Sequence, residues 1–176
     1  GRGLLLLCGD EDSTETHADR AVCRVIRVGT AASKESVNDL IATKVVQTGE
    51  QLHVTIAESV FKVTASGRHF ARSVLFAVAV SRDLGMTDKE IQLGLNSFVP
   101  VAGRCEIRQL PTCTVIDDCY NSSPEAMQAA IAVLAGRETS EQRILITGDM
   151  LLLGEHAADC HRDVGITAAA SGIDHI

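Results

Sequence analysis

The sequence has few aromatic residues, no basic run and no long hydrophobic run, and these absences exclude several classes of protein. Only 3% of its 176 residues are aromatic, and tryptophan is absent. Its longest apolar runs, Leu4–Cys8 and Val74–Val80, are much shorter than the roughly 18 residues of a membrane-spanning helix. The formal net charge of −7 argues against a surface for nucleic acid or for an anionic membrane. A small anionic ligand is still compatible with this charge, because a few cations and backbone N–H groups can bind a phosphate.

The sequence also lacks a Cys-x-x-Cys pair, although it contains six cysteines. Cys105, Cys113 and Cys119 fall in segments that we predict to be strands. We favour buried free thiols in a reducing cytoplasm, and a disulfide set or a zinc site is the alternative. Apolar residues make up 45% of the chain and charged residues 22%, so we expect a packed core rather than disorder.

Strand patterns dominate the first part of the chain. Leu4–Leu7 and Val25–Val28 are short apolar runs typical of buried strands. From about Thr43 to Thr64, apolar and polar residues alternate, with Thr48-Gly49-Glu50 as a turn. This alternation predicts an antiparallel meander with one face on a core.

Two helices are predicted to follow these strands. Arg68–Asp83 is apolar on several sides, so we expect a deeply buried helix there, ended by Gly85. The stripe that it buries is predicted to be Phe70, Val74, Ala77 and Val78. Thr87 and Glu90 have the spacing of a capping box, which begins a second, shorter helix. The stripe of this second helix is predicted to be Ile91, Leu95 and Phe98.

A linker at Pro100–Gly103 separates this region from the rest, and it predicts two domains, 1–102 and 103–176. The order beyond it is strand, loop, helix, strand, loop, helix. The strands are expected at Thr112–Asp117 and Arg143–Thr147, and the helices at 123–136 and from about Ala157. Such alternation predicts an α/β fold with a parallel sheet, whose ligand site lies at the carboxyl ends of its strands.

The end of the first of these strands carries the strongest candidate site. Asp117 and Asp118 are followed by a polar loop and a helix start. Such carboxylates can hold a sugar hydroxyl or a metal–phosphate group, and the helix N-terminus favours an anion. The alternative is that the two carboxylates cap the turn and Ser123 caps the helix.

Three further segments carry weaker signals. His69, at a helix start, can donate to a ligand or simply be satisfied locally. Arg104, beside the linker, can reach a phosphate or be solvated. Gly148-Asp149-Met150 follows a predicted strand, with Gly154-Glu155 and His161 downstream. Its glycines allow close approach of a ligand to the backbone, although they also make ordinary turns.

Taken together, these segments resemble the Mur ligase family. The motifs that carry the resemblance are, in chain order, Gly67-x-His69, Val101-Ala102-Gly103-Arg104, Ile116-Asp117-Asp118-x-Tyr120-Asn121-x-x-Pro124, and Gly148-Asp149-Met150-x-x-x-Gly154-Glu155 with His161. The last two point to the members that add D-alanyl-D-alanine. The similarity runs through nearly the whole chain, including Leu7-x-Gly9-Asp10.

The resemblance implies which part of such a ligase this chain represents. Residues 1–102 would be the second half of the central ATPase domain, a mixed sheet with helices. Residues 103–176 would be the first half of the Rossmann-like C-terminal domain. The family's phosphate-binding loop, Gly-x-x-x-x-Gly-Lys-Ser/Thr, does not occur in these residues. We therefore expect an internal fragment without catalytic residues or metal ligands of its own.

The resemblance also implies a function: an ATP-dependent amide ligase of the bacterial cytoplasm that uses ATP and Mg2+. It would add D-alanyl-D-alanine to UDP-N-acetylmuramoyl-tripeptide through an acyl phosphate. The implied ATP contacts are Arg104 at the phosphates, Asp118 at the ribose, and Tyr120, Asn121, His69 and Ser73. The implied substrate contacts are Tyr120, Asn121 and Ser123.

Four positions depart from the family pattern, among them Cys8 in place of an asparagine and Leu152 in place of a glutamate. The other two leave alternatives open. Phe70 and Ser73 stand where the family has asparagines, and the second asparagine normally meets the edge of adenine. These departures favour a second hypothesis, a non-catalytic or divergent Mur-ligase-like binding domain. A third hypothesis is a folylpolyglutamate-synthase-like ligase, which the Tyr120-Asn121 pair disfavours.

Overall fold

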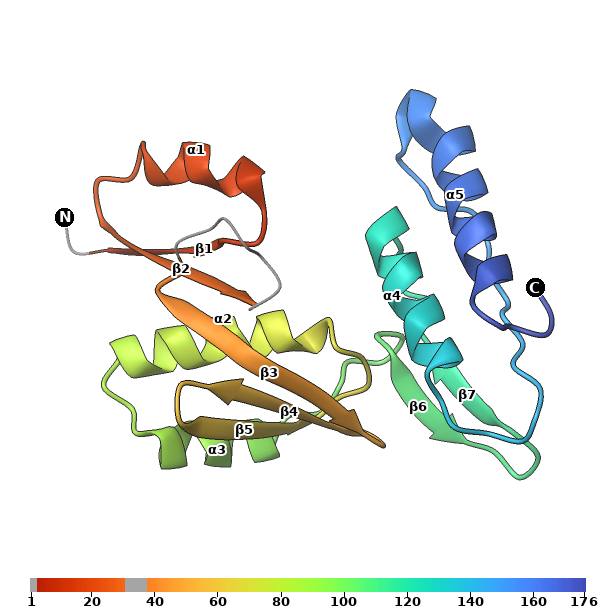
Figure 1. Ribbon diagram of the computed structural model, residues 1–176, viewed down its shortest axis with the longest axis horizontal. Helices are drawn as coiled ribbons and strands as arrows, with labels where there is room; N and C mark the ends of the chain where they lie inside the picture. The colour runs from red at the N-terminus through yellow and green to blue at the C-terminus, as the bar shows by residue number, and fades with distance from the viewer. Residues whose placement is uncertain (1–2, 31–37) are drawn as a thin grey trace. The chain divides into compact units, whose positions relative to one another are not determined.

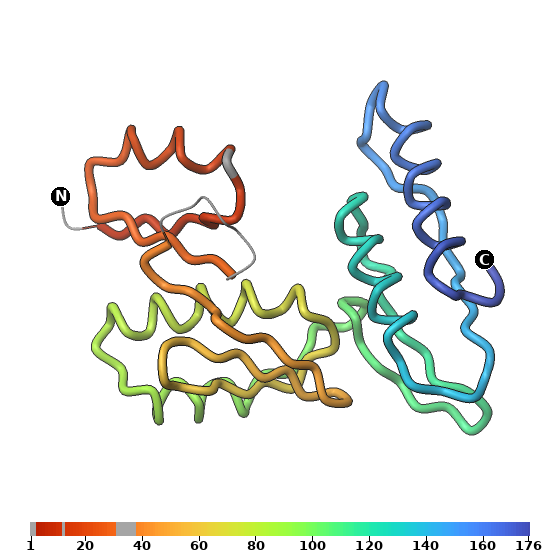
Figure 2. The backbone as a smooth tube through the Cα atoms, viewed as in Figure 1, coloured from red at the N-terminus to blue at the C-terminus, as the bar shows by residue number. Residues whose placement is uncertain are grey.

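The computed structural model describes residues 3–30 and 38–176, and the chain divides into two compact units, 1–99 and 100–176 (Figures 1 and 2). Within the described residues, no helix is long and apolar enough to span a membrane. The elements of the first unit are β1 (Leu4–Cys8), a 3-10 turn η1 (Asp12–Thr14), α1 (Glu15–Ala18), β2 (Arg24–Thr30), β3 (Leu40–Thr48), β4 (Gln51–Ile56), β5 (Ser59–Thr64), α2 (Phe70–Asp83) and α3 (Asp88–Asn96).

The first unit contains a five-stranded mixed sheet in the order β1-β2-β3-β4-β5. β1, β2 and β3 are parallel, whereas β3, β4 and β5 form an antiparallel meander. In β4, Leu52, Val54 and Ile56 are buried and alternate with half-buried residues. This period of two is what a sheet with one face on a core requires, and the predicted meander is confirmed.

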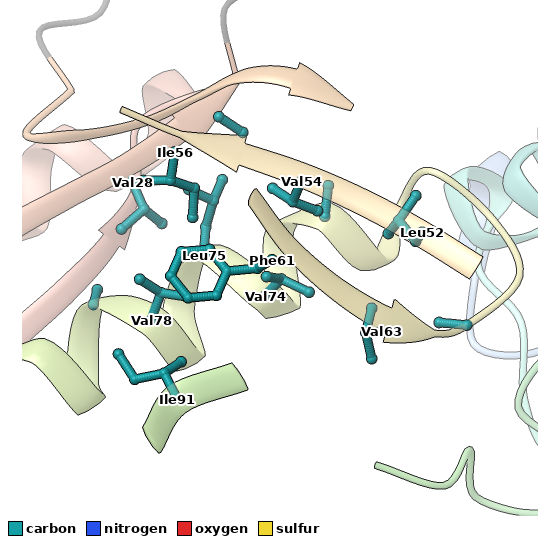
Figure 3. Packing of buried hydrophobic residues seen from close by; sticks show 14 residues of the cluster. Val28, Leu52, Val54, Ile56, Phe61, Val63, Val74, Leu75, Val78 and Ile91 are labelled. Atoms are coloured by element: carbon teal, nitrogen blue, oxygen red, sulfur yellow. The ribbon is translucent and has the colours of Figure 1, made fainter. Parts of the chain in front are cut away.

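The core of this unit lies between the sheet and α2 (Figure 3). Phe61 and Val54 pair directly across β5 and β4 and are almost fully buried. The residues that α2 buries are Ala71, Val74, Leu75, Val78 and Ala79. This face follows the helical spacing of three and four, which corrects the predicted stripe: Ala77 is exposed and Phe70 is only half-buried.

The helix α3 begins at the predicted capping box. The side chain of Thr87 accepts from Glu90 N–H, and the Glu90 carboxylate accepts from Thr87 N–H at 2.7 Å. Ile91 is buried, as predicted. Phe98 is a correction, because α3 ends before it and its side chain is 38% exposed.

A polar cluster ties α3 to α2 and to the start of β5. Asp88 accepts two hydrogen bonds from Arg82, at 2.9 and 2.8 Å, and a third from Ser59 Oγ. The hydrogen bonds from Arg82 and then from Ser59 hold the pKa of Asp88 below its usual value. The charged form of Asp88 is therefore the form that stabilises the fold.

We expect Asp88→Asn to lower the stability of this unit by about 0.5–1 kcal/mol at pH 7, since the pair is partly exposed. A lowered carboxyl pKa contributes stability above the unfolded value of about 3.9 and loses it as pH falls through the folded value. The difference in melting temperature between wild type and Asp88→Asn should therefore shrink below about pH 4. Glu58→Gln, in the exposed turn before β5, is the matched control and should show no such difference. A difference that persists unchanged at pH 3 would contradict the assignment.

The second unit contains a two-stranded sheet and two longer helices. Its elements are β6 (Glu106–Gln109), β7 (Thr114–Asp117), α4 (Pro124–Ala135), a 3-10 turn η2 (Gly154–His156) and α5 (Ala157–Ala170). α4 and α5 pack on each other around Ile131, Val164 and Ala168. The predicted helices are confirmed, including the start at Ser123 and the end before Gly136.

The predicted parallel sheet is a correction. β7 pairs with β6 in an antiparallel hairpin, because the chain reverses over residues 110–113 and so short a connection allows only antiparallel pairing. The segment 143–147 is not a strand, and its ladder consists of one parallel bridge from Ile144 to His175. Ile146 is 92% exposed, because no strand of the described residues flanks this segment and buries it.

The cysteines also differ from the prediction. Cys8 and Cys105 are buried, whereas Cys113 and Cys119 are exposed, and all six are free thiols. Cys105, Cys113 and Cys119 all lie just outside the strands. Burial, and then the nearby Asp118 carboxylate, raise the pKa of the Cys105 thiol to about 11. This thiol is therefore protonated and unreactive at neutral pH.

Candidate functional site

The strongest candidate site lies in the second unit, where the segment before β6 meets the end of β7. Tyr120 N–H donates to the carbonyl of Gly103 at 3.2 Å, and Cys105 N–H donates to Asp118 Oδ1 at 3.0 Å. Gly103 is buried and has a φ of +69°, a conformation that favours glycine. These contacts place Arg104, Asp118 and Tyr120 beside one another.

The two adjacent carboxylates have different environments. The Cys119 thiol, and then Arg108 at 2.9 Å, lower the pKa of Asp117. Asp117 is therefore engaged within the hairpin. Asp118 is oriented by the N–H of Cys105 at one oxygen, and a carboxylate has further lone pairs with which to accept from a hydroxyl. Of the two, Asp118 is the better placed to bind a ligand.

Arg104 stacks on Tyr120, with its guanidinium carbon 4.4 Å from the centre of the ring. Both side chains are exposed. Such a cation–π contact orients the guanidinium and leaves its charge in place. Among the described residues, Arg104 forms no ion pair with a carboxylate, whereas Arg108 nearby pairs with both Glu106 and Asp117. The positive charge of Arg104 is therefore available to an anion.

Asn121 and Ser123 also lie in this region, and both make local hydrogen bonds. Asn121 Oδ1 accepts from Ser122 N–H at 2.9 Å. Ser123 Oγ accepts from Ala126 N–H at 3.2 Å and caps α4, with Pro124 in the first turn. Capping accounts for Ser123 without any ligand, and its contact with substrate stays a prediction.

His69 and Ser73 lie in the first unit, one turn apart at the start of α2. His69 is exposed at the N-cap position, and its ring contacts that of Phe70. Ser73 is exposed on α2. The site residues expected from sequence thus lie in both units. The contacts bring together Arg104, Asp118 and Tyr120, whereas those of Asn121 and Ser123 are local.

A pocket of about 400 Å³ in the first unit contains residues that sequence reasoning missed. Its lining residues are Thr30, Ala42, Thr43, Lys44, Val45, Arg68, His69 and Ala71. Two of them, Lys44 and Arg68, are cationic, so this pocket can accept an anion. Arg68, next to His69, was the available signal, whereas Lys44 belongs to the alternating pattern of the meander and to no motif. Within the described residues, no three His, Cys, Asp or Glu side chains group to hold a metal ion.

The chain is similar to several known proteins. Residues 103–176 match the family model "Mur ligase, glutamate ligase domain". The chain is 39% identical over 111 residues to a UDP-N-acetylmuramoyl-tripeptide–D-alanyl-D-alanine ligase of Escherichia coli, a match that covers 62% of the chain and 24% of that protein. It is 28% identical to the ligase of the same name from Bacillus subtilis, over 99% of the chain and 37% of that protein.

A solved structure extends the similarity to the fold. It is titled UDP-N-acetylmuramoylalanyl-D-glutamyl-2,6-diaminopimelate–D-alanyl-D-alanyl ligase and comes from Acinetobacter baumannii. It superimposes with a TM-score of 0.83 and 25% identity, over 100% of this chain and 38% of that one. The chain thus spans between a quarter and two fifths of the length of these relatives. Residues 103–176 thus match a Mur ligase domain, and the chain as a whole is similar in sequence and fold to part of these D-alanyl-D-alanine-adding ligases.

Proposed function

We propose that this chain is part of an ATP-dependent amide ligase that adds D-alanyl-D-alanine to UDP-N-acetylmuramoyl-tripeptide in the bacterial cytoplasm. The names of the E. coli and B. subtilis relatives support this reaction. The single observation that carries it is the Arg104 guanidinium, which forms no ion pair within the described part of the chain and stacks on Tyr120 beside Asp118. A cation for phosphate and a carboxylate for ribose, held close together, suit a nucleotide.

In the proposed reaction, an oxygen of the tripeptide carboxylate attacks the γ-phosphorus of ATP, and ADP leaves. The amine of the dipeptide then attacks the acyl phosphate carbon; phosphate leaves, the amine loses a proton and the amide bond is complete. Arg104 contributes by binding phosphate oxygens, and Asp118 by accepting hydrogen bonds from the ribose. Both act by positioning and charge neutralisation. Tyr120, Asn121 and Ser123 would lie beside the nucleotide and the incoming dipeptide, and we assign no Mg2+ ligand within the described residues.

The assignment of domains is part of the proposal. Residues 1–102 would belong to the central ATPase domain, where His69 and Ser73 would contact the nucleotide. Residues 103–176 would belong to the Rossmann-like C-terminal domain. A non-catalytic relative is the second candidate, and the replacement of two family asparagines by Phe70 and Ser73 favours it.

The function is tested by assaying the full-length gene product with ATP, Mg2+, UDP-N-acetylmuramoyl-tripeptide and D-alanyl-D-alanine. Phosphate release that requires both the tripeptide and the dipeptide is the expected result. Release that instead requires a folate and glutamate would support the folylpolyglutamate-synthase-like alternative. Nucleotide binding without any turnover would support the non-catalytic relative.

The departure at Ser73 gives a separate prediction. In a working ligase, Ser73→Asn should tighten ATP binding by about 1 kcal/mol, or roughly fivefold. An amide can both accept from the amino group of adenine and donate to a ring nitrogen, which the shorter hydroxyl cannot do at once. The dissociation constant for ATP, measured by calorimetry, checks this.

The matched control is Ala77→Asn, which adds the same amide at another exposed position of α2. It should leave ATP affinity unchanged. If Ser73→Asn also leaves affinity unchanged, the adenine is bound elsewhere, and the implied role of Ser73 is wrong.

A further inference from the structure

The side chain of His161, on α5, anchors the loop that follows residues 143–147 in the second unit. Met150 N–H donates to His161 Nε2 at 2.9 Å, and His161 Nδ1 lies 2.7 Å from the carbonyl of Ala157. A backbone N–H can only donate and a carbonyl can only accept. Nε2 must therefore be unprotonated and Nδ1 must carry the hydrogen. This geometry requires the neutral form of His161.

Little else fixes this loop. Among the described residues, Met150 N–H is the one backbone donor of residues 148–152 that has a hydrogen-bond partner. The side chain of Met150 is buried with Ile131 and Val164, whereas Leu151 and Leu152 are fully or largely exposed. Met150, through its buried side chain and its bond to His161, and the partly buried Leu153 thus attach the loop to the unit.

A second partner for His161 lies close by. Asp149 Oδ1 is 3.8 Å from His161 Nε2, and the Asp149 side chain is 90% exposed. The carboxylate therefore faces the nitrogen that the neutral ring keeps unprotonated.

The other titratable groups near the ring are otherwise engaged or uncharged. On α5, Asp159 pairs with Arg162, and the neighbouring Cys160 packs in the apolar cluster. In η2, Glu155 and His156 face each other. α4, the other helix packed on α5, contributes Met127 and Ile131 to the apolar cluster. Asp149 is therefore the carboxylate that can accept a hydrogen bond from a protonated Nε2.

We propose that His161 is a positioning residue for the loop 148–153, and that its protonation exchanges its partner from Met150 N–H to the Asp149 carboxylate. A protonated Nε2 and the Met150 N–H would be two donors facing each other, so the existing bond must break. The new Nε2–H can then donate to Asp149 in a charge-assisted hydrogen bond. Because the loop directly follows residues 143–147, the exchange alters that edge of the unit. This device does not depend on the proposed ligase activity.

Hydrogen exchange of the full-length gene product, without nucleotide, tests the proposal. The measured quantity is the protection of the peptide that contains Met150, relative to the unstructured exchange rate at the same pH. We expect protection about tenfold lower near pH 5.5 than near pH 8. In His161→Gln, the amide oxygen can accept from Met150 N–H but does not titrate, so protection should be retained at both values. In His161→Leu, the protection of this peptide should be low at both pH values.

Two further variants make the assignment specific. Asp149→Asn should move the transition to lower pH, because the carboxylate favours the charged imidazole. His156→Gln removes an exposed histidine of the adjacent turn and should leave the transition unchanged. The proposal is overturned if wild-type protection is independent of pH, or if the transition persists in His161→Gln. Neither result depends on whether the gene product ligates D-alanyl-D-alanine.

Discussion

Truncation of Phe61 to alanine is expected to lower the free energy of unfolding of the first unit by about 3–5 kcal/mol. Phe61 is only 2% exposed, and its ring lies in the core between β5 and α2 (Figure 3). Its removal loses both the transfer of an aromatic ring from water and the packing that surrounds it. Native-state hydrogen exchange of β4 and β5 in the full-length gene product reports the free energy of opening.

Val60→Ala is the matched control, because Val60 is the preceding residue of β5 and is 51% exposed. Its effect should be within about 0.5 kcal/mol, as for most exposed positions. Equal losses in the two variants would mean that β5 does not present alternate faces to core and solvent.

The meander that holds Phe61 was predictable because its signal is local. Alternation of apolar and polar residues over β4 and β5 specifies both the strand and the face that it buries. The strand β6 has no comparable signal, since Ile107 is its one apolar residue. Its existence depends on pairing with β7, and pairing is a tertiary property that the composition of one segment does not reveal.

The segment 143–147 shows the opposite case. Ile144, Leu145 and Ile146 have the composition of a buried strand, yet Ile144 bridges only to His175. A strand pattern states which residues favour a pleated and buried environment, and does not supply the partner. The apolar run was therefore visible in the sequence, whereas its pairing could not be predicted from it.

The candidate site was predictable in its residues but not in its contacts. Motif spacing selected Arg104, Asp118 and Tyr120, and all three lie together. The hydrogen bond from Cys105 N–H to Asp118 could not be predicted, because a backbone donor has no signature in the sequence. The hydrogen bond from Met150 N–H to His161 is of the same kind. Side-chain motifs can identify a site, whereas the backbone groups that orient it become visible only in the fold.

The second large effect is expected at Asp118. Asp118→Ala in the full-length gene product should weaken ATP binding about 10- to 150-fold, the equivalent of about 1.5–3 kcal/mol for a hydrogen bond to a charged group. The reason is the loss of the carboxylate that is proposed to accept from the ribose. Asp149→Ala removes a carboxylate that is 90% exposed in another loop, and it should have a smaller effect. The Michaelis constant for ATP and its calorimetric dissociation constant check both variants.

Asp118 also accepts from Cys105 N–H, so loss of binding in Asp118→Ala has two explanations. The alanine removes the acceptor of this bond from the buried Cys105, which would loosen the segment that carries Arg104. Asp118→Asn separates the two, because its amide oxygen can still accept from Cys105 N–H while the charge is removed. If the carboxylate binds ribose, Asp118→Asn should keep a melting temperature near that of wild type and still lose ATP affinity. If Asp118→Asn binds ATP as wild type does and only Asp118→Ala fails, then Asp118 positions the linker and the nucleotide contact is wrongly assigned.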